Sequence, residues 1–435
     1  MFYVFALLLP FVFELSFYLA VLWVLIYFSI RSFKNKEAIL IFILLLRCFM
    51  VLDNQNILIG NQYLVCREVF YYRAYSLVFL CDSKNTYISY FDPNVNIQYA
   101  DEIYLYEPKF EYNLERIAYY KSLNVSGLIK FTQFKVLFSQ KTFLGSIYAF
   151  KNRFKTFVQN NLNDPFANLF LGILIGDRSG YSKFLSEDLR FVGLTHLVAV
   201  SGMNVLLILN ILKKFSWIFG RKLAFFFNSL FIIFFAYFTS LTTSVLRACF
   251  MSIINLWGEY NFLRLDSLKV LLFTAYALLL INPYYIVYDL SYALSFLATL
   301  ALILVKDTER IVNDWKLEIQ ANLVSFWFTI PVILFAFKSL PVLTVFSNLL
   351  VMYPATLILY LGLFLILIYI LNFDYLFSLI FFLLDLLGSY FFWVVDFTKK
   401  FPLMNVFIDS FKIRLVLFLF LGIIFFVFLR KNFKF

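Results

Sequence analysis

Histidine, charged residues and paired cysteines are all scarce in this chain, and their scarcity excludes several classes of protein. His196 is the only histidine among 435 residues, and none of the four cysteines belongs to a Cys-x-x-Cys pair. Zinc sites built from several histidines or from paired cysteines are therefore excluded, and we expect neither a metal ion nor another cofactor. No Gly-x-x-x-x-Gly-Lys phosphate-binding sequence occurs either, so an ATP-driven motor would be a separate protein.

Charged residues make up only 14% of the chain and hydrophobic residues 63%, whereas a soluble domain is roughly 25% charged. The run 342–371 contains no aspartate, glutamate, lysine or arginine, and it exceeds the about 20 residues that cross a bilayer. The composition therefore predicts a polytopic α-helical membrane protein. Its bundle spans are expected at 193–212, 222–239, 243–258, 267–281, 289–305, 321–337, 342–371, 375–396 and 411–430.

The charge balance is strongly basic, at +11 from 37 basic and 26 acidic residues. Basic residues gather in the cytoplasmic loops of membrane proteins. A basic surface also attracts a polyanion such as DNA. The charge alone leaves both interpretations open.

Polarity changes along the chain and divides it into four segments. We expect a transmembrane anchor at 1–52, a small soluble β domain at 53–140, an amphipathic helix at 141–165 and a transmembrane bundle at 166–435. The β domain is expected because strand-like runs alternate with turn residues there. The preceding loop, 31–36, is basic and typical of the cytoplasm, which places the β domain on the outer face. The amphipathic helix has two possible positions, the membrane interface or the surface of the next segment.

Two groups of residues in the expected β domain are candidates for function. Cys66 and Cys81 fall on adjacent expected strands, where an outer-face location permits a disulfide, and two buried thiols are the alternative. The second group mixes aromatic and basic side chains, as surfaces that bind single-stranded nucleic acid do. It consists of Arg67, Tyr71, Tyr72, Arg73, Tyr75 and Lys84. Aromatic residues are abundant throughout the chain, which weakens this second signal.

Polar residues interrupt the apolar bundle at a few places, and each costs free energy to bury in lipid unless it finds a partner. The first interruption holds His196, Ser201, Gly202 and Asn204, and a helix break there would line a water-filled cavity. A helix–helix contact of small and polar residues is the alternative. A hydrolase with Ser201 as nucleophile is disfavoured, because His196 lies about 140° away around an ideal helix.

Arg247 is the costliest residue to place in the bundle, at about 2.5 kcal/mol or more in mid-span. Ser244 lies one turn away, so both side chains can face one cavity. We expect Arg247 to line a translocation path and to contact phosphate, and a structural pair with a carboxylate or a helix carbonyl is the alternative. The other candidates for this path are polar residues at expected helix ends or on one helix face: Asp177, Arg178, Ser291, Ser295 and Asn348.

Four motifs, in order, resemble those of the ComEC competence family. They lie at Gly172–Val205, Thr243–Met251 with its Ser-x-x-Arg-Ala pattern, Asp289–Ala298, and Pro331–Pro354. The resemblance covers about residues 166–360. The family's layout likewise has an OB-like β domain after its first spans, and residues 119–127 are similar to its linker into the bundle. The resemblance thus implies a polytopic α-helical membrane protein with an inserted small OB-like β domain.

The resemblance implies a channel that carries single-stranded transforming DNA across the bacterial inner membrane, without catalysis by this chain. The partners that it implies are single-stranded DNA, membrane lipid, a DNA receptor outside the membrane and a helicase-type motor in the cytoplasm. Many relatives carry a C-terminal metallo-β-lactamase-like domain. This sequence has one histidine and stops soon after Arg430, so we expect no such domain and any nuclease would be separate. Composition alone equally permits a secondary transporter of a small anionic solute.

Overall fold

The computed structural model describes most of the chain between residues 62 and 401, and residues 406–407. The gaps inside that range are 68, 72–74, 82–85, 93–94, 96, 112–124, 140–142, 196–199, 217, 219, 240, 283–284, 286–288, 305–314, 338 and 341–343. The expected N-terminal anchor, His196 and the last expected span lie outside the described residues.

Eight short strands form one sheet near the start of the described chain. They are β1 (Gln62–Val65), β2 (Phe70–Tyr71), β3 (Ser76–Cys81), β4 (Thr86–Phe91), β5 (Asp101–Tyr106), β6 (Lys109–Glu111), β7 (Gly127–Lys130) and β8 (Gln133–Ser139). Buried and exposed residues alternate along β1 and β5, which is the pattern of a sheet with one solvated face. The strands run in the order β6-β7-β4-β3-β1-β5-β8, with β2 paired to β3.

The two ends of this strand order meet, so the sheet closes on itself. Tyr106 of β5 pairs with Gln133 of β8, and Lys109 of β6 pairs with Lys130 of β7, in one nearly continuous antiparallel register. Residues 101–111 and 127–139 therefore act as two long, bent strands. All pairings are antiparallel except that of β4 with β7. Inside the closed sheet lies an apolar core that includes Val65, Tyr87 and Ile103.

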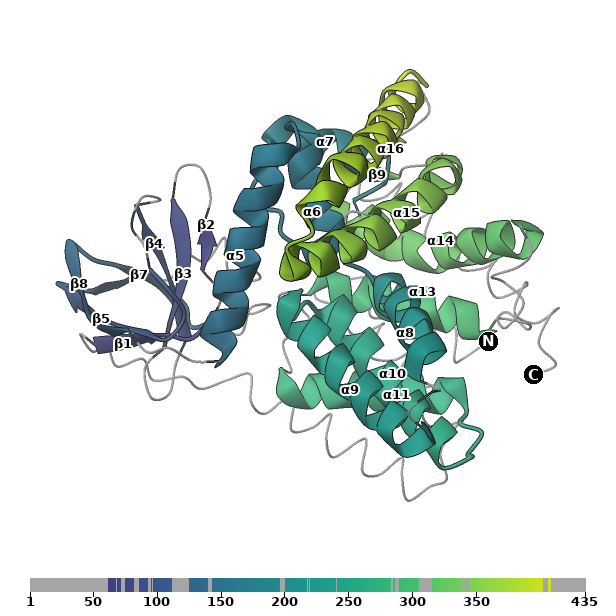
Figure 1. Ribbon diagram of the computed structural model, residues 1–435, viewed down its shortest axis with the longest axis horizontal. Coiled ribbons are helices and arrows are strands. Elements are labelled where there is room, and N and C mark those ends of the chain that lie inside the picture. The colour runs from purple at the N-terminus through teal and green to yellow at the C-terminus, as the bar shows by residue number, and fades with distance from the viewer. Residues whose placement is uncertain are drawn as a thin grey trace.

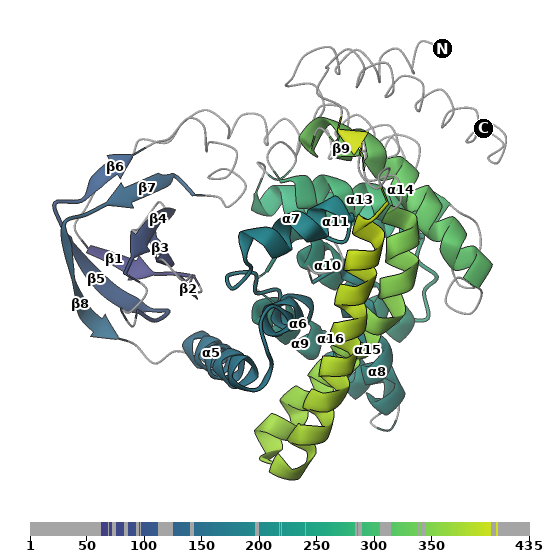
Figure 2. The same ribbon diagram turned by 90° about the horizontal axis from the view of Figure 1, so that it is seen from above.

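Helices make up the rest of the described chain (Figure 1). They are α5 (Phe143–Asn161), α6 (Phe166–Ile175), α7 (Lys183–Phe191), α8 (Gly202–Ser216), α9 (Gly220–Phe238), α10 (Thr243–Tyr260), α11 (Ser267–Ile281), α13 (Leu290–Leu304), α14 (Trp315–Phe337), α15 (Thr344–Leu371), the 3₁₀ helix η6 (Asp374–Leu376) and α16 (Phe377–Lys399). A small sheet joins β9 (Ser339–Leu340) to β10 (Val406–Phe407). The sheet domain lies at one side of the helical bundle, and α5 lies between the two (Figures 1 and 2).

Three helical segments of the described chain are long and apolar enough to cross a membrane: Gly220–Phe238, Thr344–Leu371 and Asp374–Lys399. Large apolar side chains on them remain exposed, such as Phe226, Leu357 and Phe382, as expected for surfaces that face lipid. Several shorter apolar helices accompany them. The predicted class is thus confirmed: the chain is a polytopic α-helical membrane protein that carries a small β domain.

All ten residues of the short helix α6 are buried. Two glycines allow neighbouring helices to approach it closely. A β-carbon at Gly362 of α15 would overlap Leu174, and one at Gly388 of α16 would overlap Phe166. α6 is therefore a packed interior helix, and its ten residues are fewer than the about 20 that cross a bilayer.

The amphipathic helix α5 turns its apolar face toward protein. Phe154 and Val158 are fully buried in the same core as α6, α15 and α16. The ring of Phe154 lies 5.5 Å from that of Tyr369 in α15, and Phe157 lies 5.6 Å from Phe381 in α16. This contact fits the second expected position, on the surface of the next segment, and its placement at the membrane interface stays a prediction.

Candidate functional site

The sequence motif around Ser201 and Gly202 lies where helix α8 begins. The described residues before it, 192–195 and 200–201, are not helical, so the expected break in the span is present. Gly202 is the first helical residue. A β-carbon at this position would overlap Nη2 of Arg247 in α10, so any larger residue requires the guanidinium to move.

Asn204 ties the start of α8 to the end of α6. Its side-chain Nδ2 donates a hydrogen bond to the carbonyl oxygen of Ile173 at 3.1 Å, and its Oδ1 accepts one from the Ser201 hydroxyl at 3.2 Å. The last carbonyls of a helix have no partner within the helix. Asn204 therefore satisfies a carbonyl that would otherwise be buried without a hydrogen bond.

Arg247 is held by uncharged partners from a neighbouring helix. Its Nε donates to the hydroxyl of Ser295 in α13 at 2.8 Å, and its Nη1 donates to Thr299 one turn further along. Nη1 also lies 3.8 Å from the sulfur of Met251. In the described part of the chain no carboxylate forms a salt bridge with Arg247. The positive charge is thus oriented by hydroxyl groups and not neutralised by them.

Ser244 and Thr243 extend this polar cluster toward the start of α10 and α13. The hydroxyls of Ser244 and Ser295 lie 3.2 Å apart. The Thr243 hydroxyl donates to Oδ2 of Asp289 at 3.0 Å. Oδ1 of Asp289 accepts the backbone N–H of Ser291 at 2.8 Å and so caps the first turn of α13.

Two helices begin beside Arg247 and add to its positive field. The first N–H groups of a helix point outward and give its N-terminus a partial positive charge. α8 begins at Gly202, in contact with Arg247, and α10 begins at Thr243, one turn from it. The residue before α10, Thr242, makes no side-chain capping hydrogen bond. A guanidinium and helix N-termini are both groups that suit an anion such as phosphate.

Asp177, which was expected to line the path, forms an ion pair with a lysine. Its Oδ2 lies 2.6 Å from Nζ of Lys155 in α5, and the two side chains are only 10% and 15% exposed. Oδ1 accepts the backbone N–H of Ser179, whose hydroxyl accepts a hydrogen bond from Lys155. Burial raises the pKa of Asp177, but the charge and hydrogen bond of Lys155, with those from Ser179, outweigh it and bring the pKa below its usual value. Asp177 thus fixes α5 to the turn after α6.

Among the remaining described candidates of the bundle, some contact Arg247 and others do not. Ser295 contacts Arg247, whereas Ser291 is exposed and donates only its backbone N–H to Asp289. Arg178 is exposed, next to the buried Asp177. Asn348 in α15 donates from Nδ2 to Oδ1 of Asn322 in α14 at 2.8 Å. The contacts of the described residues do not join Arg178 or Asn348 to the cluster around Arg247.

Only two of the six aromatic and basic candidates in the β domain have described side chains. The guanidinium carbon of Arg67 lies 5.0 Å from the ring centroid of Phe79, a cation–π distance. Tyr75 packs edge to face on Tyr90 at 5.0 Å and remains partly exposed. Tyr72, Arg73 and Lys84, and the side chain of Tyr71, lie outside the described residues.

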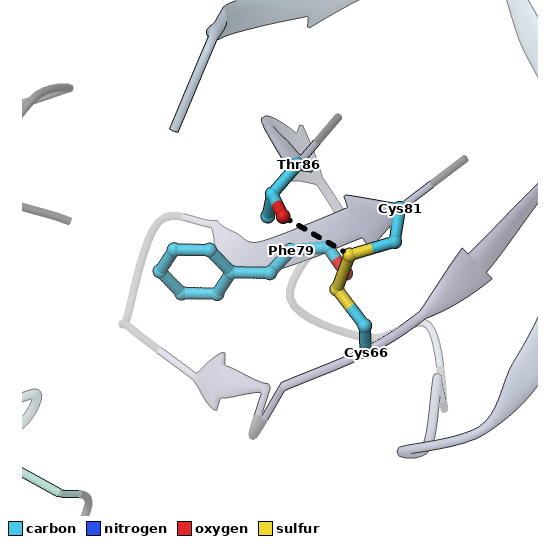
Figure 3. The surroundings of a disulfide bond; sticks show 4 residues. All are labelled: Cys66, Phe79, Cys81 and Thr86. Atoms are coloured by element: carbon cyan, nitrogen blue, oxygen red, sulfur yellow. Dashed lines mark hydrogen bonds between the residues drawn. A yellow bond between two sulfur atoms is a disulfide. The ribbon is translucent and has the colours of Figure 1, made fainter. Parts of the chain in front are cut away.

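Cys66, the residue after β1, and Cys81, the last residue of β3, form a disulfide (Figure 3). The backbone N–H of Cys66 donates to the carbonyl of Phe79 at 3.1 Å, which continues the β1–β3 pairing up to the bridge. The Thr86 hydroxyl of β4 lies 3.3 Å from the sulfur of Cys81. The bridge fixes the chain immediately before Arg67.

Sequence patterns did not identify four residues that take part in these contacts: Lys155, Thr243, Asp289 and Thr299. Thr243 and Asp289 each begin a motif that the sequence marked, and their position at expected helix ends was an available signal. Thr299 lies one turn after Ser295 on the same helix face, a spacing that also identifies it. Lys155 gave no signal, because nothing local indicates that its partner is Asp177.

The chemistry that this cluster offers is the binding of a charged or polar group. The Ser201 hydroxyl donates to an amide oxygen, which is no general base. The described residues contain no group of three or more histidine, cysteine, aspartate or glutamate side chains that could hold a metal ion. What the cluster offers is a fixed positive charge lined by hydroxyl groups.

The comparison with known protein families gives one result. The model of a family described as "Competence protein" matches residues 173–433, which is more than half of the chain and includes the cluster around Arg247. Neither a curated protein nor a solved structure matches the sequence.

Proposed function

Because the chain belongs to the competence protein family, whose role is DNA uptake, we propose that it conducts single-stranded DNA across the bacterial inner membrane during natural transformation. The charge of the partly buried Arg247 is the observation that supports this proposal most. Hydroxyl groups orient its guanidinium, no carboxylate of the described chain pairs with it, and two helices begin beside it. A buried cation is costly unless it serves a ligand or finds a counter-ion.

In this proposal the ligand that neutralises Arg247 is the phosphate backbone of the passing strand. Hydroxyl groups of Ser244, Ser295 and Thr299 lie around the guanidinium and offer exchangeable hydrogen bonds to successive phosphates. Uncharged partners bind the strand weakly enough to release it, which conduction requires. The base sequence of the DNA plays no part in such contacts, because the phosphate group is the same at every nucleotide.

The β domain is proposed to be OB-like and to lie on the outer face. With residues 101–111 and 127–139 each counted as one bent strand, β1, β3 and β4 complete a closed five-stranded sheet, and a five-stranded barrel is the arrangement of that fold. The disulfide between Cys66 and Cys81 suits an oxidising compartment outside the cytoplasm. From there the domain receives a strand from a DNA receptor. A cytoplasmic motor supplies the energy, and a separate nuclease removes the second strand.

A compartment-resolved uptake assay tests this function. Cells that lack the gene receive labelled double-stranded DNA, and the label is measured outside the inner membrane and in the cytoplasm. We expect DNA to reach the outer compartment but not the cytoplasm, and re-expression of the chain to restore entry. Undiminished cytoplasmic entry in the deleted strain would refute the proposal. If transformation is normal but uptake of a small anion fails, a secondary transporter is the correct function.

A further inference from the structure

The turn between α10 and α11 exposes an aromatic side chain that the fold does not bury. Phe262, two residues after the end of α10, is 79% exposed. Its φ angle is +57°, in the left-handed region that glycine most often occupies after a helix. The turn itself is well ordered by hydrogen bonds, because the backbone N–H of Leu263 donates to the carbonyl of Gly258 at 2.8 Å. Neither burial nor backbone preference therefore explains a phenylalanine at this position.

Arg221, at the start of the neighbouring helix α9, lies over that ring. Its guanidinium carbon is 3.5 Å from the ring centroid of Phe262 and 5.8 Å from that of Tyr260. Phe225, one turn further along α9, stacks on Tyr260 with ring centroids 5.4 Å apart. A guanidinium whose flat face packs on a ring still directs its N–H groups outward, in its own plane. The exposed Arg221 is therefore positioned to donate hydrogen bonds to a ligand outside the protein.

Basic residues dominate the two segments that meet at this ring. Residues 213–222 and 257–269 contain six basic and two acidic residues. Both acidic residues already have partners, since Glu259 pairs with Lys213 at 2.6 Å and Asp266 caps the first turn of α11. Within the described chain, no carboxylate forms a salt bridge with three exposed basic residues of these segments: Arg221, Lys222 and Arg264. This end of the bundle thus presents a positively charged surface.

The exposed side of α9 shows where this positive surface lies relative to the membrane. α9 begins at Gly220 and is long and apolar enough to cross a bilayer. Large apolar side chains along it remain exposed, beginning with Leu223 and Phe226, as expected for a surface that faces lipid. Arg221 and Lys222 come directly before this apolar surface, at the depth where a membrane span meets the lipid headgroups. The positive surface is therefore continuous with the side of α9 that faces lipid.

We propose that Arg221, Lys222 and Arg264, with the ring of Phe262, form a binding site for the phosphate group of an anionic phospholipid. The basic side chains bind the phosphate, and the exposed ring lies at the level of the headgroups, as aromatic residues do at membrane interfaces. Basic residues gather at the cytoplasmic ends of spans, so the lipid belongs to the cytoplasmic leaflet. A basic surface with an aromatic ring also suits single-stranded DNA, but continuity with the lipid-facing side of α9 favours lipid. This inference does not depend on the proposed function.

Lipid binding to the purified full-length protein tests this assignment. The protein in a neutral detergent is titrated with phosphatidylglycerol or with phosphatidylcholine, and bound lipid is counted by native mass spectrometry. We expect phosphatidylglycerol to bind more tightly. Each basic residue near an anionic lipid contributes about fivefold in affinity, so Arg221→Gln/Arg264→Gln should weaken the tightest phosphatidylglycerol binding about 25-fold. The charge-matched control Lys183→Gln/Arg190→Gln, made at exposed residues of α7, should leave that binding unchanged.

A change at Phe262 separates lipid binding from folding. Phe262→Gly removes the ring and introduces the residue that a left-handed backbone prefers, which offsets the lost contact with Arg221. Its unfolding temperature in lipid-free detergent should therefore equal or exceed that of the unmodified protein. Its affinity for phosphatidylglycerol should fall several-fold, because the apolar contact between the ring and the lipid is lost. Unchanged affinity in Phe262→Gly would overturn the role of the ring.

Three other results would overturn the lipid assignment. Equal losses of phosphatidylglycerol affinity in the two double variants would show an effect of net charge alone. Equal affinity of the unmodified protein for phosphatidylcholine would show that the charge of the lipid is not recognised. If Arg221→Gln/Arg264→Gln loses binding to a fluorescent oligothymidylate but keeps its affinity for phosphatidylglycerol, the surface binds single-stranded DNA and not lipid.

Discussion

Gly202 at the start of α8 and Arg247 in α10 lie in direct contact, and the guanidinium occupies the space where any other residue would place its β-carbon. Ala248, the next residue of α10, would lie 3.3 Å from the same β-carbon. The contact explains why a glycine follows Ser201 at a helix N-terminus. It also joins two motifs that lie more than forty residues apart in sequence.

Substitution of this glycine should displace the arginine. In Gly202→Ala the added methyl group pushes the guanidinium away from Ser295 and Thr299, and overpacking of this kind costs about 1–3 kcal/mol. We expect lower thermal stability in detergent and reduced DNA entry into the cytoplasm. Ser201→Ala, which adds no bulk at the neighbouring position, is the control and should retain most uptake. A Gly202→Ala protein with normal stability and normal uptake would show that the close contact has no role.

Removal of the Asn204 amide should loosen the connection between α8 and α6. In Asn204→Leu the carbonyl of Ile173 loses its donor while buried, at a cost of about 1–3 kcal/mol. We expect a lower unfolding temperature in detergent. Ser201→Ala removes only a hydrogen bond to the side chain of Asn204, so its effect should be smaller. An unchanged unfolding temperature in Asn204→Leu would mean that the carbonyl finds another partner.

The ion pair between Asp177 and Lys155 should make stability depend on pH in the acidic range. The pKa of Asp177 is lower in the folded protein than its usual value of about 3.9. Its contribution is therefore complete above about pH 4 and disappears as the pH falls through the folded pKa. Asp177→Asn leaves Lys155 buried without its counter-ion, at about 3 kcal/mol.

Unfolding temperatures of the two proteins between pH 7 and pH 3 check this sign. We expect a large difference at pH 7 that shrinks below about pH 4, as the unmodified protein loses its pair. A difference that grows toward low pH would contradict the depressed pKa of Asp177.

Local sequence patterns predicted much of this fold. Strand-like runs between turn residues predicted strands at 62–68, 73–81, 86–91 and 102–106, close to the observed β1, β3, β4 and β5. Apolar runs located α9, α10, α11 and α15 within a few residues of their ends. The strands β2, β6, β7 and β8 were not predicted. The first three have only two, three and four residues, and the described side chains of β8 are mostly exposed, so none shows the pattern of a half-buried strand. Only pairing with distant strands defines them.

In the candidate site, too, local sequence patterns identified some residues but not the contacts between distant segments. The free-energy cost of placing an arginine in lipid identified Arg247, and its spacing from Arg247 along the helix identified Ser244. Both arguments need only the local sequence. The role of Asn204 depends on Ile173, and that of Asp177 depends on Lys155, and neither partner is near in sequence. Such contacts arise from the packing of α6 against α5 and α8. A single sequence does not encode them in any local pattern.

The most direct test of the account is DNA entry in cells that carry a single change at Arg247. Arg247→Gln keeps a side chain that can bind Ser295 but removes the charge, so we expect cytoplasmic label to fall at least tenfold while label in the outer compartment is unchanged. Arg190→Gln, made at matched protein level in the membrane, should enter normally. Normal cytoplasmic entry with Arg247→Gln at that protein level would contradict a conduit in which Arg247 binds the phosphates of the passing strand.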